Sequence, residues 1–224
     1  MTFLRWNRLP ALGAGLLVLA CGGSDGGGGT GPCTPGAATQ LVKTSGDPAA
    51  WYLDNPLPTP LSVTARDANN CPVPGVVVNW AVASGGGGVS PSQSTTGPAG
   101  AATTTDSIGS TSPQTVTATF TGLPTPVTFT ASASAPPTSA DVTVNNNFFS
   151  PAAAFMQTGG TVTWTWNSSG AVHDVAYDTG PAPLPANSTP QGSGTHSNTI
   201  TPVGRYTYHC NFHAGMSGSV TVLH

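Results

Sequence analysis

Apolar and polar residues alternate along much of the chain, in short runs that are separated by turn residues. One run extends from Leu61 to Ala65, and another resumes from Val76 to Trp80 after the turn sequence ANNCPVPG. A period of two predicts strands that bury one face. Similar runs cover residues 100–105, 114–120, 127–133, 142–144 and 161–167. The pattern therefore predicts an all-β protein built from short strands.

Composition agrees with this pattern and excludes one class of partner. The chain has 29 glycines and 22 prolines, which is typical of a protein with many turns. Charged residues make up only 6% of the sequence, every acidic residue is aspartate, and the formal net charge is −3. Because nucleic-acid binding needs a basic surface, we expect no nucleic-acid partner.

The first 31 residues have the pattern of an export signal followed by a tether. A basic start precedes an apolar run from Ala11 to Ala20, which is too short to span a membrane. Residues 18–21, VLAC, resemble a bacterial lipobox, so residues 1–20 are expected to be a signal peptide and Cys21 the lipid-bearing residue. The glycine-rich residues 21–31 would then be a flexible tether. An ordinary signal peptide cut near Ala20 is the alternative.

Residues 32–133 are expected to form the first module. Its regular short strands and turn clusters predict a β-sandwich, and the pattern resembles a bacterial Ig-like domain of the invasin-associated type. Trp80 is expected in its core. The module has no histidine, and Asp67 is followed by Ala-Asn-Asn, which indicates a turn rather than a calcium loop. We expect a spacer or docking role. The proline-bearing residues 134–140 are expected to be a linker.

The cysteines divide into two kinds. If Cys21 is lipidated, an exported protein can join Cys33 and Cys71 in a disulfide, and Cys210 is left over. An unpaired thiol outside the cytoplasm is a liability unless something occupies it, and a metal ion would do so. The alternative for Cys210 is a buried and inert thiol.

Metal-ligating residues gather near the C-terminus. Cys210, His213 and Met216 follow one another in a Cys-x-x-His-x-x-Met spacing, between two alternating runs that predict strands. The upstream strand-like run AVHDVAYD carries His173, the expected fourth ligand. Two imidazoles, a thiolate and a thioether are the ligand set of a blue-copper site, which accepts both Cu(I) and Cu(II). A satisfied core histidine is the alternative for His173.

Residues 141–224 resemble a cupredoxin, and their ligand loop is most similar to that of amicyanin. The resemblance rests on four segments of the sequence, NNFFSP, GGTVTWTWN, VHDV and YTYHCNFHAGM. It implies a Greek-key β-sandwich with one type 1 copper, held by His173, Cys210 and His213 in a plane and by Met216 axially. It also implies that His213 is partly exposed within an apolar collar, in which Phe212 and Ala214 would dock a redox partner.

Two residues depart from the family pattern. Plastocyanin-like carriers usually follow the first ligand histidine with asparagine, whereas this chain has Asp174. We expect Asp174 to accept hydrogen bonds from the region of Asn211 and to lower the reduction potential. The other departure is the small pair Ala214-Gly215, where amicyanin-like loops carry bulkier residues.

The other histidines are not expected to bind metal. Strand alternation turns His209 to the face opposite Cys210, and His196 and His224 are expected to be solvated. His196 belongs to the proline- and glycine-rich stretch between Tyr177 and Ser197, which is expected to be a surface loop that buries little.

Together these features indicate an extracytoplasmic electron carrier, in the periplasm or on the cell surface. Copper would cycle between Cu(I) and Cu(II), redox partner proteins would bind weakly and transiently, and the membrane would be reached only through the lipid anchor. We expect no enzymatic activity, because neither an open coordination position nor a substrate pocket is suggested. Copper trafficking or storage is one alternative, and a surface adhesin with a structural cupredoxin domain is another.

Overall fold

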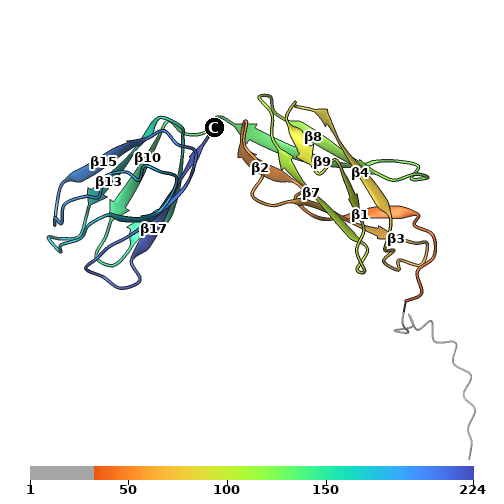
Figure 1. The fold of residues 1–224 in the computed structure, drawn as a ribbon, viewed down its shortest axis with the longest axis horizontal. Coiled ribbons are helices and arrows are strands. Elements are labelled where there is room, and N and C mark those ends of the chain that lie inside the picture. Colours follow the sequence, from red (N-terminus) through yellow and green to blue (C-terminus); the bar gives the residue numbers. More distant parts are fainter. Residues whose placement is uncertain (1–32) are drawn as a thin grey trace, which may run out of the picture. The chain divides into compact units, whose positions relative to one another are not determined.

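The computed structural model describes residues 33–224, and these fold into strands joined by turns and loops (Figure 1). The expected signal peptide, residues 1–20, and the tether with Cys21, residues 21–31, lie outside the described residues. No helix in the described part of the chain is long and apolar enough to cross a membrane. The all-β class predicted from the alternation is confirmed.

The first nine strands form two sheets. One sheet has the order β1-β3-β7-β5 and the other the order β2-β9-β8-β4-β6. The strands are β1 (Gln40–Ser45), β2 (Ala49–Tyr52), β3 (Leu61–Arg66), β4 (Val77–Ser84), β5 (Gly88–Ser90), β6 (Gln93–Thr95), β7 (Ala101–Ser107), β8 (Gln114–Thr119) and β9 (Val127–Ser134).

Both of these sheets contribute to one hydrophobic core. Val63 on β3 and Val116 on β8 are almost completely buried, and Trp80 on β4, 3% exposed, packs 5.9 Å from Phe129 on β9. Trp80 is therefore a core residue, as the alternation predicts. Burial of one such side chain contributes about 1.5–3 kcal/mol, so this shared core stabilises the two sheets as a sandwich.

The turn after β3 is built on the carboxylate of Asp67. Its Oδ1 accepts hydrogen bonds from the backbone N–H groups of Asn69 and Cys71, and its Oδ2 accepts one from Gly36. The predicted turn is confirmed, and backbone N–H donors surround this carboxylate. Cys33 and Cys71 are each disulfide-bonded and Cys210 is free. This is the state that the predicted Cys33–Cys71 pairing requires.

The last eight strands form two further sheets. Their orders are β11-β10-β13-β15 and β12-β17-β16-β14. The pairings β10–β13 and β12–β17 are parallel and the other pairings are antiparallel. The strands are β10 (Ser139–Val144), β11 (Phe149–Ser150), β12 (Ala153–Gln157), β13 (Gly160–Trp166), β14 (Ala176–Thr179), β15 (Thr195–Ile200), β16 (Gly204–His209) and β17 (Ser217–Leu223).

A second core lies between these two sheets. Trp164 on β13 and Tyr208 on β16 are fully buried, and their rings meet edge to face at 5.4 Å. Of the two adjacent phenylalanines in the NNFFSP segment, Phe149 is buried against Tyr208, whereas Phe148 is 58% exposed. The aromatic residues of the inner faces therefore fix how β13 and β16 oppose each other, which sets the frame for the ligand loop.

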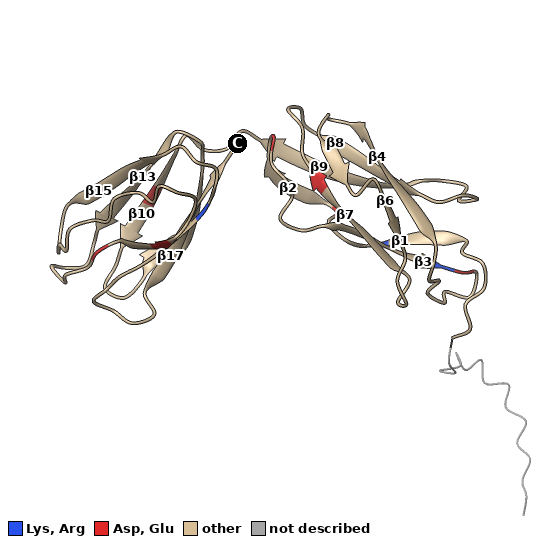
Figure 2. Cartoon of the chain, in the orientation of Figure 1, with Lys and Arg blue, Asp and Glu red and all other residues tan. Residues whose placement is uncertain are grey.

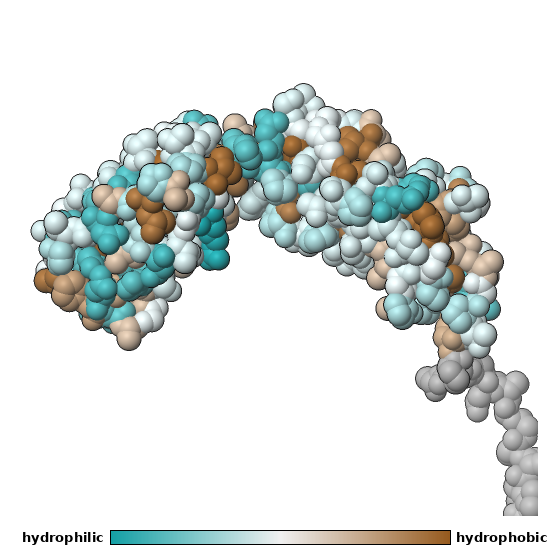
Figure 3. Space-filling model, viewed as in Figure 1, coloured by the Kyte–Doolittle hydropathy of each residue, from teal (hydrophilic) through white to brown (hydrophobic). Residues whose placement is uncertain are grey.

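Charged side chains are sparse over both sandwiches (Figure 2). Lys43, Arg66 and Arg205 are the lysine and arginine residues of the described part of the chain. The visible surface is mostly pale in the hydropathy view, with brown apolar residues in separate patches (Figure 3). β9 ends at Ser134 and β10 begins at Ser139, so four residues of the expected linker connect the two sets of strands.

Candidate metal centre

The ligand loop is the tight connection between β16 and β17. These strands pair up to His209 and Ser217, so only residues 210–216 lie between them. The N–H of Cys210 donates to the carbonyl of Met216 at 3.0 Å, and the N–H of Met216 donates to the carbonyl of His213 at 3.2 Å. Gly215 has a φ of +82°, which L side chains rarely adopt. The loop backbone thus holds its side chains in fixed directions.

The segment that carries His173 does not form the regular strand that the sequence predicts. β14 (Ala176–Thr179) begins only three residues later, and His173 instead forms an isolated antiparallel bridge with Gln191. Two backbone hydrogen bonds of 3.0 Å close this bridge, one in each direction. The indole Nε1 of Trp166 also donates to the carbonyl of His173 at 3.3 Å. The backbone of His173 is therefore fixed without a regular strand.

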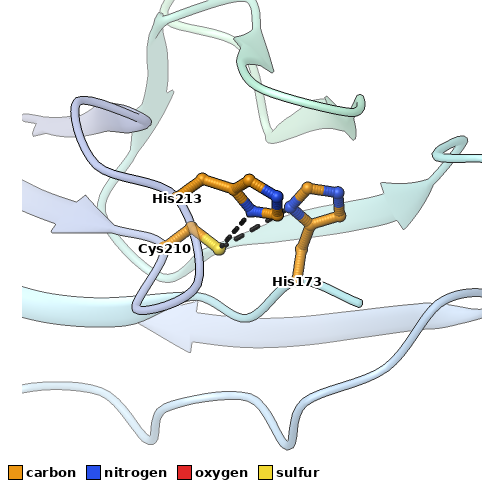
Figure 4. Close-up of side chains that lie close together, drawn as sticks. All are labelled: His173, Cys210 and His213. Atoms are coloured by element: carbon orange, nitrogen blue, oxygen red, sulfur yellow. Dashed lines mark hydrogen bonds between the residues drawn. The ribbon is translucent and has the colours of Figure 1, made fainter. Parts of the chain in front are cut away.

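Three of the predicted ligands converge (Figure 4). Sγ of Cys210 lies 3.6 Å from Nδ1 of His173 and 3.7 Å from Nδ1 of His213. The ligand atoms all lie within 4.8 Å of one another, and the two imidazole rings are 4.4 Å apart, centre to centre. His173 and Cys210 are buried and His213 is half-buried. Three donor atoms so close together leave the space between them for a single ion.

The electrostatics of the cluster favour a neutral imidazole at His173. Burial, together with the neighbouring His213, lowers the pKa of His173, although the charge of Asp174 opposes the shift. A neutral ring has a free lone pair, which a metal ligand requires. A thiolate with two imidazoles suits copper in either oxidation state, so the residues present fit the predicted ion.

Met216 lies in the same buried region. Its side chain is 2% exposed and belongs to the same hydrophobic cluster as Cys210. A thioether inside this cluster is shielded from water, as a weak axial ligand would need to be. The axial role stays a prediction.

Asp174 connects the two ligand segments. Its Oδ1 accepts a hydrogen bond from the backbone N–H of Asn211 at 2.8 Å, and its Oδ2 accepts one from the side-chain Nδ2 at 2.7 Å. Asp174 is only 6% exposed. The residue after His173 is therefore joined twice to the residue after Cys210. This is the contact that the sequence comparison with plastocyanin-like carriers suggested.

The half-buried His213 lies on a surface with several exposed apolar side chains nearby in the sequence. Phe212 is 52% exposed, and Ala214 is exposed on its other side. Val172, which directly precedes the predicted ligand His173, is 45% exposed, and nothing in the sequence indicated that it belongs to this surface. A depression of about 360 Å³ is lined by residues of the ligand loop, including His213 and Ala214.

The other two internal histidines lie outside this cluster. His209 is half-exposed, with Nδ1 2.6 Å from Asp178 and Nε2 3.1 Å from Oδ1 of Asn211. Burial alone would lower its pKa, but these hydrogen bonds and the charge of Asp178 raise it. His196 is not simply solvated, because it packs on the ring of Trp164 at 5.8 Å.

The expectation that the chain between Tyr177 and Ser197 is a loop that buries little is only partly right. Its ends belong to β14 and β15, and its middle contacts the ligand-bearing segment. Ser188 is buried, its Oγ accepts from the N–H of Val175 at 2.8 Å, and Oδ1 of Asn187 accepts from the N–H of Tyr177 at 2.9 Å. Nothing in the polar composition of this stretch indicated these contacts.

Comparisons with known proteins give structural similarity only. No family model and no curated protein matches the chain. Similar solved structures include a purple cupredoxin from Nitrosopumilus maritimus, 28% identical over 38% of this chain and 99% of that one, with a TM-score of 0.34. A mutant plastocyanin of a fern is 25% identical over 38% of this chain and 100% of that one, with a TM-score of 0.33. An amicyanin variant with Cu(I) is 25% identical over 38% of this chain and 82% of that one, with a TM-score of 0.33. Because each similarity covers less than half of this chain, the chemistry of the site has to follow from its own residues.

Proposed function

We propose that the chain is a type 1 copper protein of the cupredoxin kind, which carries single electrons between redox partners outside the cytoplasm. The observation that carries this proposal is the convergence of Cys210 with His173 and His213, whose ligand atoms lie within 4.8 Å of one another. The ligands come from two separate segments, and Cys210 is a buried free cysteine in a chain whose Cys33 and Cys71 are disulfide-bonded.

The bound copper would supply a Cu(I)/Cu(II) couple, and the protein would supply a fixed geometry for it. His173 is held by its bridge to Gln191, Cys210 by its hydrogen bond to Met216, and both segments by Asp174. Ligands that hardly move between the two oxidation states keep the reorganisation energy small, which favours fast electron transfer. Met216 would cap the site axially.

Electrons would enter and leave through His213. It is the most exposed of the three clustered ligands, and the apolar Phe212 and Ala214 flank it in the loop. A small apolar surface beside a ligand would suit a weak and transient encounter with a redox partner, which turnover requires. The polypeptide would then act as a carrier rather than as an enzyme.

The remainder of the chain would hold this site outside the cytoplasm. The disulfide-bonded state of Cys33 and Cys71 suits an oxidising compartment. The signal peptide, lipidation of Cys21 and the glycine-rich tether would anchor the protein to a membrane. The first sandwich, with an Ig-like pattern, would serve as a spacer or docking module between the anchor and the copper site.

The test is the visible spectrum of a chain that begins at Cys33, loaded with Cu(II). An intense thiolate-to-copper charge-transfer band should appear, bleach on addition of ascorbate and return on oxidation. Cys210→Ser should remove the band, and Thr189→Val, which changes an exposed loop residue, should keep it. Tight but colourless binding of Cu(I) alone would contradict the carrier and favour copper trafficking or storage.

A further inference from the structure

The chain segment from Asn187 to Gln191 is hydrogen-bonded to the segment from His173 to Tyr177 at three places. Asn187 accepts from the N–H of Tyr177, Ser188 exchanges hydrogen bonds with Val175 through its side chain and its N–H, and Gln191 exchanges two backbone hydrogen bonds with His173. Residues 173–175 precede β14, so these contacts replace a regular strand partner. The middle of the long loop therefore holds the first ligand.

Within this segment, Gln191 is the residue that lies directly opposite His173 in the bridge. In an antiparallel pair that exchanges both backbone hydrogen bonds, the two side chains leave the same face and their Cβ atoms lie about 5.5 Å apart or closer. The side chain of Gln191 is consequently a neighbour of the His173 imidazole.

Two buried polar atoms in this pair have no hydrogen-bond partner. They are Nε2 of His173 and the side-chain Nε2 of Gln191. His173 itself is completely buried, and its other ring nitrogen, Nδ1, faces Cys210 at 3.6 Å. A histidine that binds a metal through one ring nitrogen normally donates the N–H of the other to an acceptor. His173 therefore needs an acceptor at Nε2, and a buried donor without one costs free energy.

We propose that the side-chain amide of Gln191 is the positioning group of the His173 ring, with its oxygen accepting the proton on Nε2. In the structure the amide nitrogen and the ring nitrogen are not hydrogen-bonded to each other. The amide oxygen would reach Nε2 by rotation of the Gln191 side chain together with exchange of its oxygen and nitrogen positions. The buried ring N–H would then have an acceptor. This hydrogen bond fixes the tautomer that leaves Nδ1 free for the metal and fixes the ring about its Cβ–Cγ bond.

The residue after Gln191 supports this placement. A Cβ at Gly192 would meet the carbonyl oxygen of Gly170 at 2.5 Å, and Oγ of Ser168 lies 3.5 Å from the carbonyl oxygen of Gly192. The two loops thus approach each other at backbone distance beside the His173–Gln191 bridge. A side chain at position 192 would disturb this approach, and with it the backbone next to Gln191.

The first test uses the full chain without copper, so it does not depend on the proposed function. ¹⁵N-edited NMR of the imidazoles reports the tautomer of His173. Replacement Gln191→Leu keeps the backbone bridge but removes the acceptor, and the share of the Nε2–H tautomer relative to the Nδ1–H tautomer should fall about fivefold. Gln191→Glu restores an acceptor and should restore the tautomer. Thr189→Val, in the same loop, should leave it unchanged.

The second test uses the same variants with copper and rests on the proposed function. Loss of an outer hydrogen bond to a ligating histidine typically costs 10- to 100-fold in metal affinity, so Gln191→Leu should weaken Cu(II) binding by about that factor. Gln191→Glu should recover the binding and Thr189→Val should not alter it. Thermal unfolding of each copper-free variant shows whether the fold is retained.

The outcomes separate the two proposals. An unchanged His173 tautomer in a folded Gln191→Leu variant would overturn the positioning role, whether or not copper binds. A changed tautomer that Glu does not restore would also overturn it, because the effect would then come from packing alone. A changed and restored tautomer in a protein that gives no charge-transfer band would keep the positioning role and overturn the copper carrier.

Discussion

Replacement of Asp174 by asparagine should raise the reduction potential of the copper site. The side chains have nearly the same shape, so the change removes a negative charge and keeps an oxygen that can accept from the N–H of Asn211. A nearby carboxylate stabilises Cu(II) more than Cu(I), because the oxidised centre carries one more positive charge. Its removal should therefore favour the reduced state.

The size of this effect follows from the position of the carboxylate. Asp174 is buried, it directly follows His173 in the sequence, and it is hydrogen-bonded to Asn211, which directly follows Cys210. At an effective dielectric constant of about 20, unit charges about 4 Å apart interact by about 4 kcal/mol, and at twice that separation by about 2 kcal/mol. The carboxylate lies beyond the ligand atoms, so the smaller value applies. For one electron this corresponds to about 90 mV.

Protein-film voltammetry of the copper-loaded chain measures this potential directly. Asp141→Asn is the matched control, because it removes the same charge from an exposed position on β10. It should shift the potential by much less, since water screens exposed charges. If both variants shift the potential equally, or if Asp174→Asn leaves it where it was, the electrostatic role assigned to Asp174 is wrong.

Two further predictions concern the two sandwiches. Burial raises the pKa of Asp106, although the hydrogen bond from Gln114 opposes the shift. The protonated carboxyl is therefore favoured in the folded state. As the pH rises from the pKa of the unfolded chain through that of the folded chain, Asp106 ionises and the first sandwich loses stability. Urea unfolding should show Asp106→Asn gaining stability relative to the wild type between pH 4 and pH 7, and a relative loss would contradict this. Gly218→Ala would place a Cβ 2.7 Å from the ring of Tyr208, so it should cost about 1–3 kcal/mol in the same assay. Gly88→Ala, which meets nothing within 4 Å, is its control, and equal costs would show that the contact with Tyr208 is relieved.

The strands with a clear period of two were predictable from the sequence. β3, β8, β9 and β13 lie where the alternation places them, since each buries one face against a core. Short edge strands such as β2 and β6 were not found, because three or four residues give too little alternation to be recognised. Their positions depend on backbone hydrogen bonds to neighbours that are distant in the sequence.

The ligand loop was predictable for a different reason. Cys210, His213 and Met216 are close in sequence, so their spacing alone brings them near one another. His173 was found as a histidine on an upstream strand-like run, and the cupredoxin resemblance agreed with it, but its backbone conformation followed from neither. Its surroundings do not form a strand but a bridge to Gln191, and a pairing of isolated residues leaves no periodic signal.

The hydrogen bonds that Asn187 and Ser188 make in the loop between β14 and β15 could not be predicted from the sequence. Asn, Ser and Gln in a proline-rich stretch usually indicate a solvated loop. Here Ser188 and Asn187 satisfy backbone donors of Val175 and Tyr177, which have no strand partner at those atoms. The need for such acceptors becomes visible only when the start of β14 is known.

The apolar residues beside the half-buried imidazole of His213 have a consequence for how a redox partner would approach it. Phe212, Ala214 and Val172 are uncharged, and Debye screening acts only on charges. An encounter at this surface would consequently depend little on ionic strength, and its rate would remain in the range of unsteered protein association, about 10⁵–10⁶ M⁻¹s⁻¹. Partner choice would then be governed by the fit between apolar surfaces rather than by long-range attraction.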